Sequence, residues 1–272
     1  MDELNELRVA SFNMHAGVDG WGRPFDFIEA ARQLDAEVLV LQEAWTPRTG
    51  IGQAEAIGNA LGYSVISHPL ASGRLAGPDP LANDRWMRPM NWRSEKNALY
   101  LDSEHALSRR GSESDRFHSG EPGSWGIAVL SRIRVLSHEL FLLPKLKRDR
   151  SRRAAIVVAT EFGGNELIVL GTHMSHLGYG SPRHYIQLRQ FLKTLSGQNA
   201  VLLGDMNLWG PPVKVFLSDW KRAVRGRTWP AWRPHSQVDH ILTRGSLRVV
   251  KGEVMEALGS DHRPIRATLS FT

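Results

Sequence analysis

Short strand-like runs recur along the sequence, and an acidic, amide or imidazole residue stands repeatedly at or beside the end of such a run. Ligand sites in α/β proteins gather at strand ends. One such residue alone usually begins a turn or caps a helix. Independent turns need not choose these residue types every time, so the recurrence predicts one shared site. The pairs are Asn13 and His15, Gln42 and Glu43, His173 and His176, Asp205 and Asn207, Asp239 and His240, and Asp261 and His262.

The order of the predicted elements indicates mixed α/β layers. Helices alternate with strands, but several strands follow one another directly, which disfavours a regular doubly wound sheet. We find no internal repeat or linker and predict one domain over residues 1–272. The predicted strands cover residues 8–12, 37–43, 63–66, 127–130, 155–159, 167–170, 201–203, 238–242 and 265–269, and the predicted helices cover 25–34, 54–61 and 185–195.

Residues 70–122 break this rhythm. They are rich in Gly, Pro, Ser and Arg and have weak apolar periodicity, so we predict a long loop excursion. Loops of this length are usually functional or disordered. The segment carries large apolar residues among arginines, namely Trp86, Met87, Met90 and Trp92 among Arg85, Arg88 and Arg93.

Composition limits the chemistry of the site. The 272 residues include no cysteine, so disulfides and thiolate zinc sites are excluded and a metal must bind oxygen or imidazole. The net charge of +6 favours polyanionic partners: nucleic acid, an anionic lipid surface or a phosphorylated small molecule. The acidic N-terminus lacks a secretory signal pattern and no apolar run is long enough to span a bilayer, so we expect a cytoplasmic protein.

Taken in order, these motifs resemble the endonuclease/exonuclease/phosphatase superfamily, and the approach to Asp239 resembles its loosely characterised bacterial branch. The resemblance implies an α/β fold of four layers, DNase I-like, with two packed mixed β-sheets between helices and the site at one end. The matching pieces, from residue 8 to residue 269, are Asn13 after a strand, Leu41-Gln42-Glu43, Gly126 to Arg132, Gly171-Thr172-His173, Gly204-Asp205-Met206-Asn207, Val238 to Leu242 and Gly259-Ser260-Asp261-His262-Arg263-Pro264.

The resemblance also implies Mg²⁺, with Mn²⁺ as the alternative, because hard cations take oxygen ligands. In the metal group, Glu43 would be the principal ligand, Asn13 would help to position the ion, and Asp261 would lie in or next to its ligand shell.

The resemblance assigns the remaining positions to the substrate and the water. Asp205 would orient or deprotonate the attacking water. Asn207 and His173 would hold the phosphate, and Asp239 would pair with His262 to stabilise the developing charge.

The residue types fit phosphoester hydrolysis independently of the resemblance. A phosphoester is anionic and repels a nucleophile, which a cation, an imidazolium and amide donors offset while a carboxylate activates water. There is no cysteine nucleophile and no Gly-x-Ser-x-Gly motif. His173 and His176 do not have the spacing of a helical zinc pair, so we favour magnesium over zinc.

The substrate remains open among three hypotheses. In a nuclease, the basic stretch 145–153, with Arg152 and Arg153, would follow a phosphate backbone, and Trp229 and Trp232 would stack on bases. In a phospholipid or phosphorylated-metabolite hydrolase, the excursion would touch a bilayer or cover a pocket. A non-catalytic binding module is least favoured, because every motif position is kept. Ser124-Trp125 and the segment before Asp239 depart from the apurinic-site endonucleases.

Overall fold

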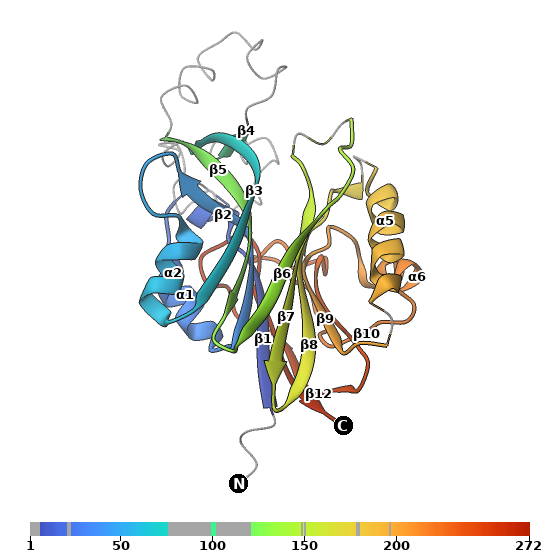
Figure 1. Cartoon of the computed structure of the whole chain (residues 1–272). Helices are drawn as coiled ribbons and strands as arrows, with labels where there is room; N and C mark the ends of the chain where they lie inside the picture. The colour runs from blue at the N-terminus through green and yellow to red at the C-terminus, as the bar shows by residue number, and fades with distance from the viewer. Residues whose placement is uncertain are drawn as a thin grey trace.

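The protein forms four layers, in which two β-sheets pack face to face and a pair of helices covers the outer side of each sheet (Figure 1). The structure is a computed structural model that describes residues 6–20, 23–75, 99–101, 121–147, 149, 151–177, 180–195 and 197–272. The prediction of a four-layer α/β sandwich is confirmed.

The first sheet has seven strands in the order β12-β13-β1-β2-β5-β3-β4. β1 and β2 are parallel, and the other neighbouring strands are antiparallel. The strands are β1 (Glu6–Asn13), β2 (Val38–Pro47), β3 (Ser64–Leu75), β4 (Leu99–Leu101), β5 (Glu121–Ser131), β12 (Leu247–Val254) and β13 (Ile265–Phe271).

The second sheet has six strands in the order β10-β11-β9-β8-β7-β6. Here β8 and β9 form the parallel pair. Each sheet thus contains one parallel pair whose strands finish side by side. The strands are β6 (Val135–Leu142), β7 (Ala154–Phe162), β8 (Asn165–His173), β9 (Ala200–Asp205), β10 (Lys221–Arg222) and β11 (Asp239–Arg244).

The helices bury apolar faces against the sheets. α1 (Phe27–Leu34) begins at Asp26, whose side chain caps the helix, and α2 (Gln53–Leu61) ends at Gly62 in the left-handed conformation. These two cover the first sheet, and α5 (Ser181–Thr194) and α6 (Gly210–Phe216) cover the second (Figure 1). A short 3-10 turn, η2 (His15–Gly17), follows β1.

Three buried apolar clusters match the four layers. One lies between the sheets and includes Val40, Val129 and Val169. The second packs α5 and α6 on one sheet, and the third packs α1 and α2 on the other. The catalytic candidates therefore sit on a framework that is buried from both sides. No helix among the described residues is long and apolar enough to cross a membrane.

The structure contains elements that the sequence did not predict: β4, β6, β10, β12 and α6. Most of β6 is exposed, so it has no apolar run to identify it. The predicted excursion at 70–122 begins too early, because β3 continues to Leu75, and it ends too late, because β5 already starts at Glu121. Residues 76–98 and 102–120, which carry Trp86 and Trp92, lie outside the described residues.

Candidate active site

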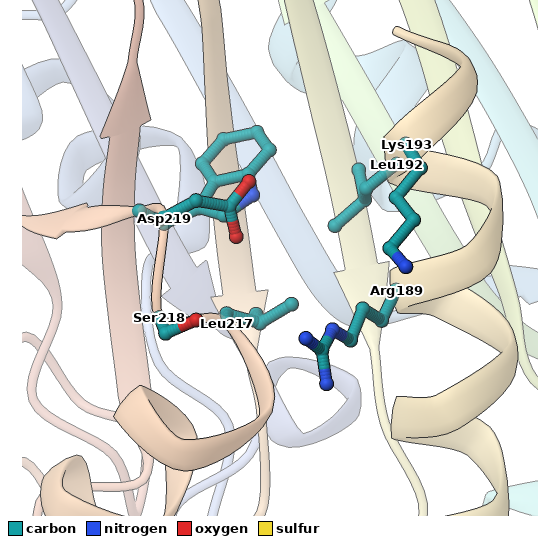
Figure 2. Close-up of a pocket in the computed structure, with 7 residues that line it drawn as sticks. Arg189, Leu192, Lys193, Leu217, Ser218 and Asp219 are labelled. Carbon is teal, nitrogen blue, oxygen red and sulfur yellow. The ribbon is translucent and has the colours of Figure 1, made fainter. Parts of the chain in front are cut away.

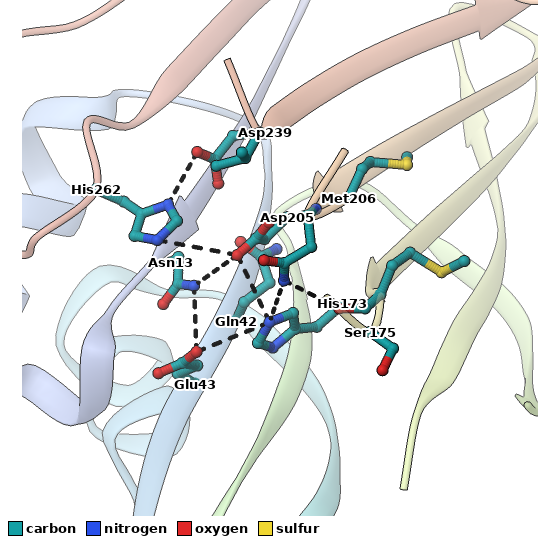
Figure 3. Close-up of polar contacts among 12 residues, drawn as sticks. Asn13, Gln42, Glu43, His173, Ser175, Asp205, Met206, Asp239 and His262 are labelled. Carbon is teal, nitrogen blue, oxygen red and sulfur yellow. Dashed lines mark hydrogen bonds and ion pairs between the residues drawn. The ribbon is translucent and has the colours of Figure 1, made fainter. Parts of the chain in front are cut away.

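Six of the polar residues singled out in the sequence meet at the end of the sandwich where both parallel strand pairs finish, namely Asn13, Glu43, His173, Asp205, Asp239 and His262 (Figure 3). In the first sheet, Asn13 of β1 lies opposite Gln42 of β2. In the second, Asp205 of β9 lies opposite both His173 of β8 and Asp239 of β11. The segment just before β13 adds Asp261 and His262.

A β-bulge directs Glu43 toward this end. The β2–β5 pairing shifts register between Gln42 and Ala44, and Glu43 has a φ of +53°. Positive φ is uncommon for a residue with a side chain, and such backbone strain clusters at functional sites. Asn207 is also in this region, with a φ of +47°. Gly204 makes room before Asp205, because a Cβ at its φ of +152° would stand 1.9 Å from the Thr172 carbonyl oxygen.

Asn13 joins two carboxylates. Its Nδ2 donates to Asp205 Oδ2 at 3.1 Å and reaches Glu43 Oε1 at 3.5 Å. Its Oδ1 accepts the backbone N–H of His15 at 3.1 Å. The side chain of Asn13 is thus held from both sides, and it fixes the spacing between Glu43 and Asp205.

His262 lies between the carboxylates of Asp205 and Asp239. Its Nδ1 donates to Asp239 Oδ2 at 3.0 Å, and its Nε2 lies 3.9 Å from Asp205 Oδ2. Burial lowers the pKa of His262, but the charges of Asp239 and Asp261 more than offset this and raise the pKa well above the ordinary 6.5. His262 is therefore an imidazolium at neutral pH.

The pKa of Asp205 is raised as well, which in a carboxyl group favours the neutral form. Burial and the neighbouring charge of Asp239 raise the pKa of Asp205 to about 7, although His262 and the Asn207 amide lower it. Its Oδ1 accepts the Asn207 backbone N–H at 2.8 Å. A carboxyl with a pKa near neutral can accept a proton during a reaction at that pH.

His173 is the neutral imidazole of the site. Burial, with the nearby positive charges of Arg153 and His262, lowers its pKa well below 6.5. Its Nε2 lies 3.3 Å from Asn207 Nδ2, 3.5 Å from Asp205 Oδ2 and 3.8 Å from Glu43 Oε1. Its Nδ1 is buried and has no hydrogen-bond partner among the described residues.

Asp261 lies beside the site in its own ring of donors. Trp229 Nε1 donates to its Oδ2 at 3.2 Å, and His15 Nδ1 lies 3.8 Å from its Oδ1. Burial raises the pKa of Asp261, but His15 and His262 more than offset this and lower it. The neighbouring Ser260 hydroxyl donates to the Asn13 carbonyl at 2.7 Å, which ties this segment to β1.

The donor set fits a hard divalent cation. Three carboxylates, from Glu43, Asp205 and Asp239, face a region in which His262 is the positive partner, and Asp239 Oδ1 is buried without a hydrogen-bond partner among the described residues. Burial is the main cause of the raised pKa of Asp205, and the negative charges of Asp239 and Glu43 add to it. Oxygen ligands of this kind suit Mg²⁺ or Mn²⁺. Asp205, Asp239 and His262 also offer ligand atoms within 4.8 Å of one another. However, an imidazolium does not ligate a metal, so Glu43 is the better ligand.

The four residues predicted to contact the substrate lie in different environments. Trp229 is half-buried at the site, with its ring 6.5 Å from that of His262, and Trp232 is half-buried too. Arg152 is exposed. Arg153, which was expected to follow a phosphate backbone, is instead buried, and its Nε donates to Asp149 Oδ2 at 2.9 Å. Arg148 and Arg150 of that stretch lie outside the described residues.

Sequence reasoning missed Trp209, which stands two residues after Asn207 at the start of α6. Its side chain is 51% exposed, and its indole N–H lies 3.4 Å from Ser236 Oγ. A tryptophan placed so close to a Gly-Asp-x-Asn motif was the available signal. The exposed indole beside the site could contact a flat ligand group.

A separate pocket lies between α5 and the segment after α6 (Figure 2). It has a volume of about 150 Å³, with Arg189 and Lys193 facing Ser218 and Asp219. The pocket is at the other end of β11 from Asp239, because Lys221, which follows the lining residue Trp220, pairs with Thr243. None of the site residues described above lines it, so we place the candidate active site at the strand ends.

Comparisons with known proteins identify the family of the chain. The sequence model of the Endonuclease/Exonuclease/phosphatase family matches residues 10–262. No match was found among curated proteins. An endonuclease/exonuclease/phosphatase from Beutenbergia cavernae DSM 12333 is similar in structure, with a TM-score of 0.66, 19% identity, and coverage of 98% of this chain and 72% of that chain.

Two further solved structures show the same fold. A mannosyl-6-phosphatase from Bacteroides thetaiotaomicron VPI-5482 has a TM-score of 0.64 and 17% identity, with coverage of 97% of this chain and 100% of that chain. The human Nocturnin catalytic domain, solved with a bound sulfate anion, has a TM-score of 0.63 and 16% identity, with coverage of 98% and 95%.

Proposed function

Because the chain belongs to the endonuclease/exonuclease/phosphatase family, whose members hydrolyse phosphoester bonds, we propose that it is a divalent-metal-dependent nuclease. It would cut a phosphodiester with an activated water. The observation that carries the proposal is the meeting of Glu43, Asp205, Asp239 and the imidazolium of His262 at one end of the sandwich.

Asp205 is the group that activates the water. Its pKa of about 7 is close to the pH at which an intracellular enzyme works, which suits a general base. Asn13 and the Asn207 amide hold its two oxygens at 3.1 Å and 2.8 Å. With the carboxylate held in this way, it can take the proton of a water without first rearranging.

The imidazoles stabilise the phosphate as its charge develops. His262 is positive because Asp239 holds its Nδ1, so its Nε2 offers a charged donor to a phosphate oxygen. His173 is neutral and lies beside the Asn207 side-chain amide. The His173 imidazole and the Asn207 amide would thus form a second set of hydrogen bonds to the phosphate, and both groups are uncharged.

Glu43, with Asn13 beside it, would hold the metal, which we propose to be Mg²⁺ with Mn²⁺ as the alternative. A bound divalent cation polarises the phosphoryl oxygen and lowers the pKa of a coordinated water. Asp261 lies beside the site, where it adds negative charge and accepts a hydrogen bond from Trp229.

Nucleic acid is the proposed substrate because the loops around the site are basic and carry exposed aromatic surface. In the described part of residues 143–153, Lys145, Lys147 and Arg152 are exposed, and the one acid is the buried Asp149. Residues 223–238, which lead into Asp239, contain arginines but no acidic residue. Basic loops follow a phosphate backbone, and an exposed indole such as Trp209 stacks on bases.

A phospholipid or phosphorylated-metabolite hydrolase is the second candidate. The similarity in fold to a mannosyl-6-phosphatase supports it. A cytoplasmic location stays a prediction.

A hydrolysis panel tests the proposal: duplex DNA, single-stranded DNA, RNA, a phospholipid vesicle and bis-p-nitrophenyl phosphate, each with Mg²⁺ and with chelator. We expect metal-dependent cleavage of a nucleic acid that is lost in Asp205→Asn. Cleavage of only the vesicle or the small diester would establish the second candidate. Trp209→Ala should raise the KM for single-stranded DNA about fivefold or more and leave the rate on bis-p-nitrophenyl phosphate unchanged, since it removes a stacked base contact.

A further inference from the structure

Arg153 is buried next to the site but is bound to another residue rather than free to meet a substrate. Its side chain is 8% exposed, and its Nε and Nη2 reach the two Asp149 oxygens at 2.9 and 3.5 Å. Asp149 also accepts hydrogen bonds from the Ser175 hydroxyl and from the Ser151 backbone N–H. Arg153 and Asp149 therefore form a buried ion pair in the loop before β7, anchored to the segment that follows β8.

The same guanidinium links the two sheets. Arg153 Cζ lies 5.4 Å from the ring centre of Trp125, which belongs to β5 in the opposite sheet. The Trp125 ring in turn lies 5.5 Å from the His173 ring, tilted by 49°. A guanidinium over an indole face is attractive at this distance. One continuous set of contacts thus runs from Asp149 through Arg153 and Trp125 to His173.

His173 depends on this packing for its orientation. A functional histidine is commonly oriented by a hydrogen bond through its second ring nitrogen. Here Nδ1 has no hydrogen-bond partner among the described residues. The ring instead packs against the tilted ring of Trp125, and its backbone continues to Ser175, whose hydroxyl contacts Asp149.

We propose that Arg153 is a positioning residue that orients His173 through its stack on Trp125 and its ion pair with Asp149. The inference rests on the proposed function, in which His173 contacts the phosphate. It replaces the expectation that Arg153 follows a nucleic-acid backbone. Because a misplaced catalytic group costs turnover rather than substrate binding, a change at Arg153 acts on kcat.

The test is a double-mutant cycle between Arg153→Lys and His173→Gln, with kcat and KM measured on bis-p-nitrophenyl phosphate with Mg²⁺. Lysine keeps the positive charge for Asp149, so the fold is retained, but it loses the planar stack on Trp125. We expect Arg153→Lys to lower kcat about tenfold while KM changes less than about twofold. In the His173→Gln background, the same change should lower kcat less than about twofold.

Arg134→Lys is the matched control, since Arg134 is 77% exposed and pairs with Glu161 near the opposite end of β7. It should leave both constants unchanged. Trp125→Phe is a second variant through the same link, and its loss of kcat should also vanish in the His173→Gln background.

Each contrary result has a separate meaning. An equal loss from Arg153→Lys in both backgrounds would overturn the inference, because Arg153 would then act independently of His173. A raised KM with unchanged kcat would also overturn it, in favour of a direct substrate contact. If His173→Gln alone keeps full activity, the proposed role of His173 fails together with the inference. If His173→Gln loses activity and Arg153→Lys does not, the inference fails alone.

Discussion

The two ends of β1 hold charge in different ways. At the beginning of the strand, Arg8 meets Glu37, with Nη2 2.6 Å from Oε1, and also pairs with Asp35. These side chains are 23–55% exposed. At its finish, Asn13 is buried between the carboxylates of Glu43 and Asp205. One end pairs opposite charges in water, and the other gathers like charges away from it.

The pKa shifts show what this difference means. The hydrogen bond to Glu37 raises the pKa of Arg8, because folding stabilises its charged form. Burial raises the pKa of Asp205 to about 7, because folding destabilises its charged form. Both pKa values are raised, but the shift of Arg8 reflects a stabilising interaction of its charge and the shift of Asp205 reflects a destabilising one. The Arg8 end contributes a little to the fold, whereas the Asp205 end costs stability and keeps a reactive carboxylate.

The largest expected effect is the loss of turnover in Asp205→Asn. An amide cannot take a proton from water, so kcat should fall about 10³-fold. The rate is measured on bis-p-nitrophenyl phosphate with Mg²⁺, and Mg²⁺ affinity should remain within a few fold of the wild type. A variant that keeps more than about a tenth of the rate would remove Asp205 from the role of base.

The second effect concerns the metal. Glu43→Gln removes a charged ligand and should weaken Mg²⁺ or Mn²⁺ binding at least about tenfold, measured by calorimetry. Glu55→Gln is a suitable control, because Glu55 lies on α2 and its Oε1 accepts the Ser67 hydroxyl. Unchanged metal affinity in Glu43→Gln would place the ion elsewhere in the cluster.

The third effect is a dependence of stability on pH in the absence of metal. The unfolded Asp205 has a pKa near 3.8 and the folded one about 7. The folded state binds the proton of Asp205 more tightly than the unfolded state does. The stabilisation that comes from this proton is therefore complete below pH 4 and is lost as pH rises through 7. In chelator, the stability of Asp205→Asn relative to the wild type should therefore increase between pH 5 and pH 8, by about 2–3 kcal/mol.

Urea unfolding of both proteins at the two pH values measures this gain. Added Mg²⁺ should reduce the difference, because the cation stabilises the ionised carboxylate. An advantage of Asp205→Asn that is equal at pH 5 and pH 8 would show that ionisation of Asp205 is not its cause.

The smallest effect lies at the opposite end of β1. Glu37→Gln should destabilise the fold by about 0.5–1 kcal/mol, since partly exposed ion pairs contribute little. Activity should not change. If this variant also lowered kcat, the two ends of the strand would be coupled, and the contrast drawn above would not hold.

The residues that the sequence singled out come together in the structure because strand ends converge by topology. Asn13, Glu43, His173, Asp205 and His262 each stand beside an apolar run, and the fold brings such positions together. The prediction was weaker where a residue's role depends on its partner. Nothing in the sequence around Arg153 shows that Asp149 binds it, because the same arginine could equally face solvent.

Some secondary-structure elements could not be predicted from the sequence for related reasons. β12 has an exposed face and a register shift between Val249 and Lys251, so its apolar residues do not alternate cleanly. α6 has only 7 residues, fewer than a periodic pattern requires. Trp209 was missed because an exposed tryptophan and a buried one look identical in a sequence.

The bulge at Glu43 also sets the phase of its strand. Before it, Val38 and Val40 face the space between the sheets, while Leu39 and Leu41 face the helices. After it, the parity is reversed, with Ala44 toward the helices and Trp45 between the sheets. Deleting residue 43 would remove the bulge and restore regular alternation, which leaves Ala44 toward the helices and Trp45 between the sheets. The extra residue therefore adds a carboxylate at the end of the sandwich without changing which side chains of the strand pack into either core.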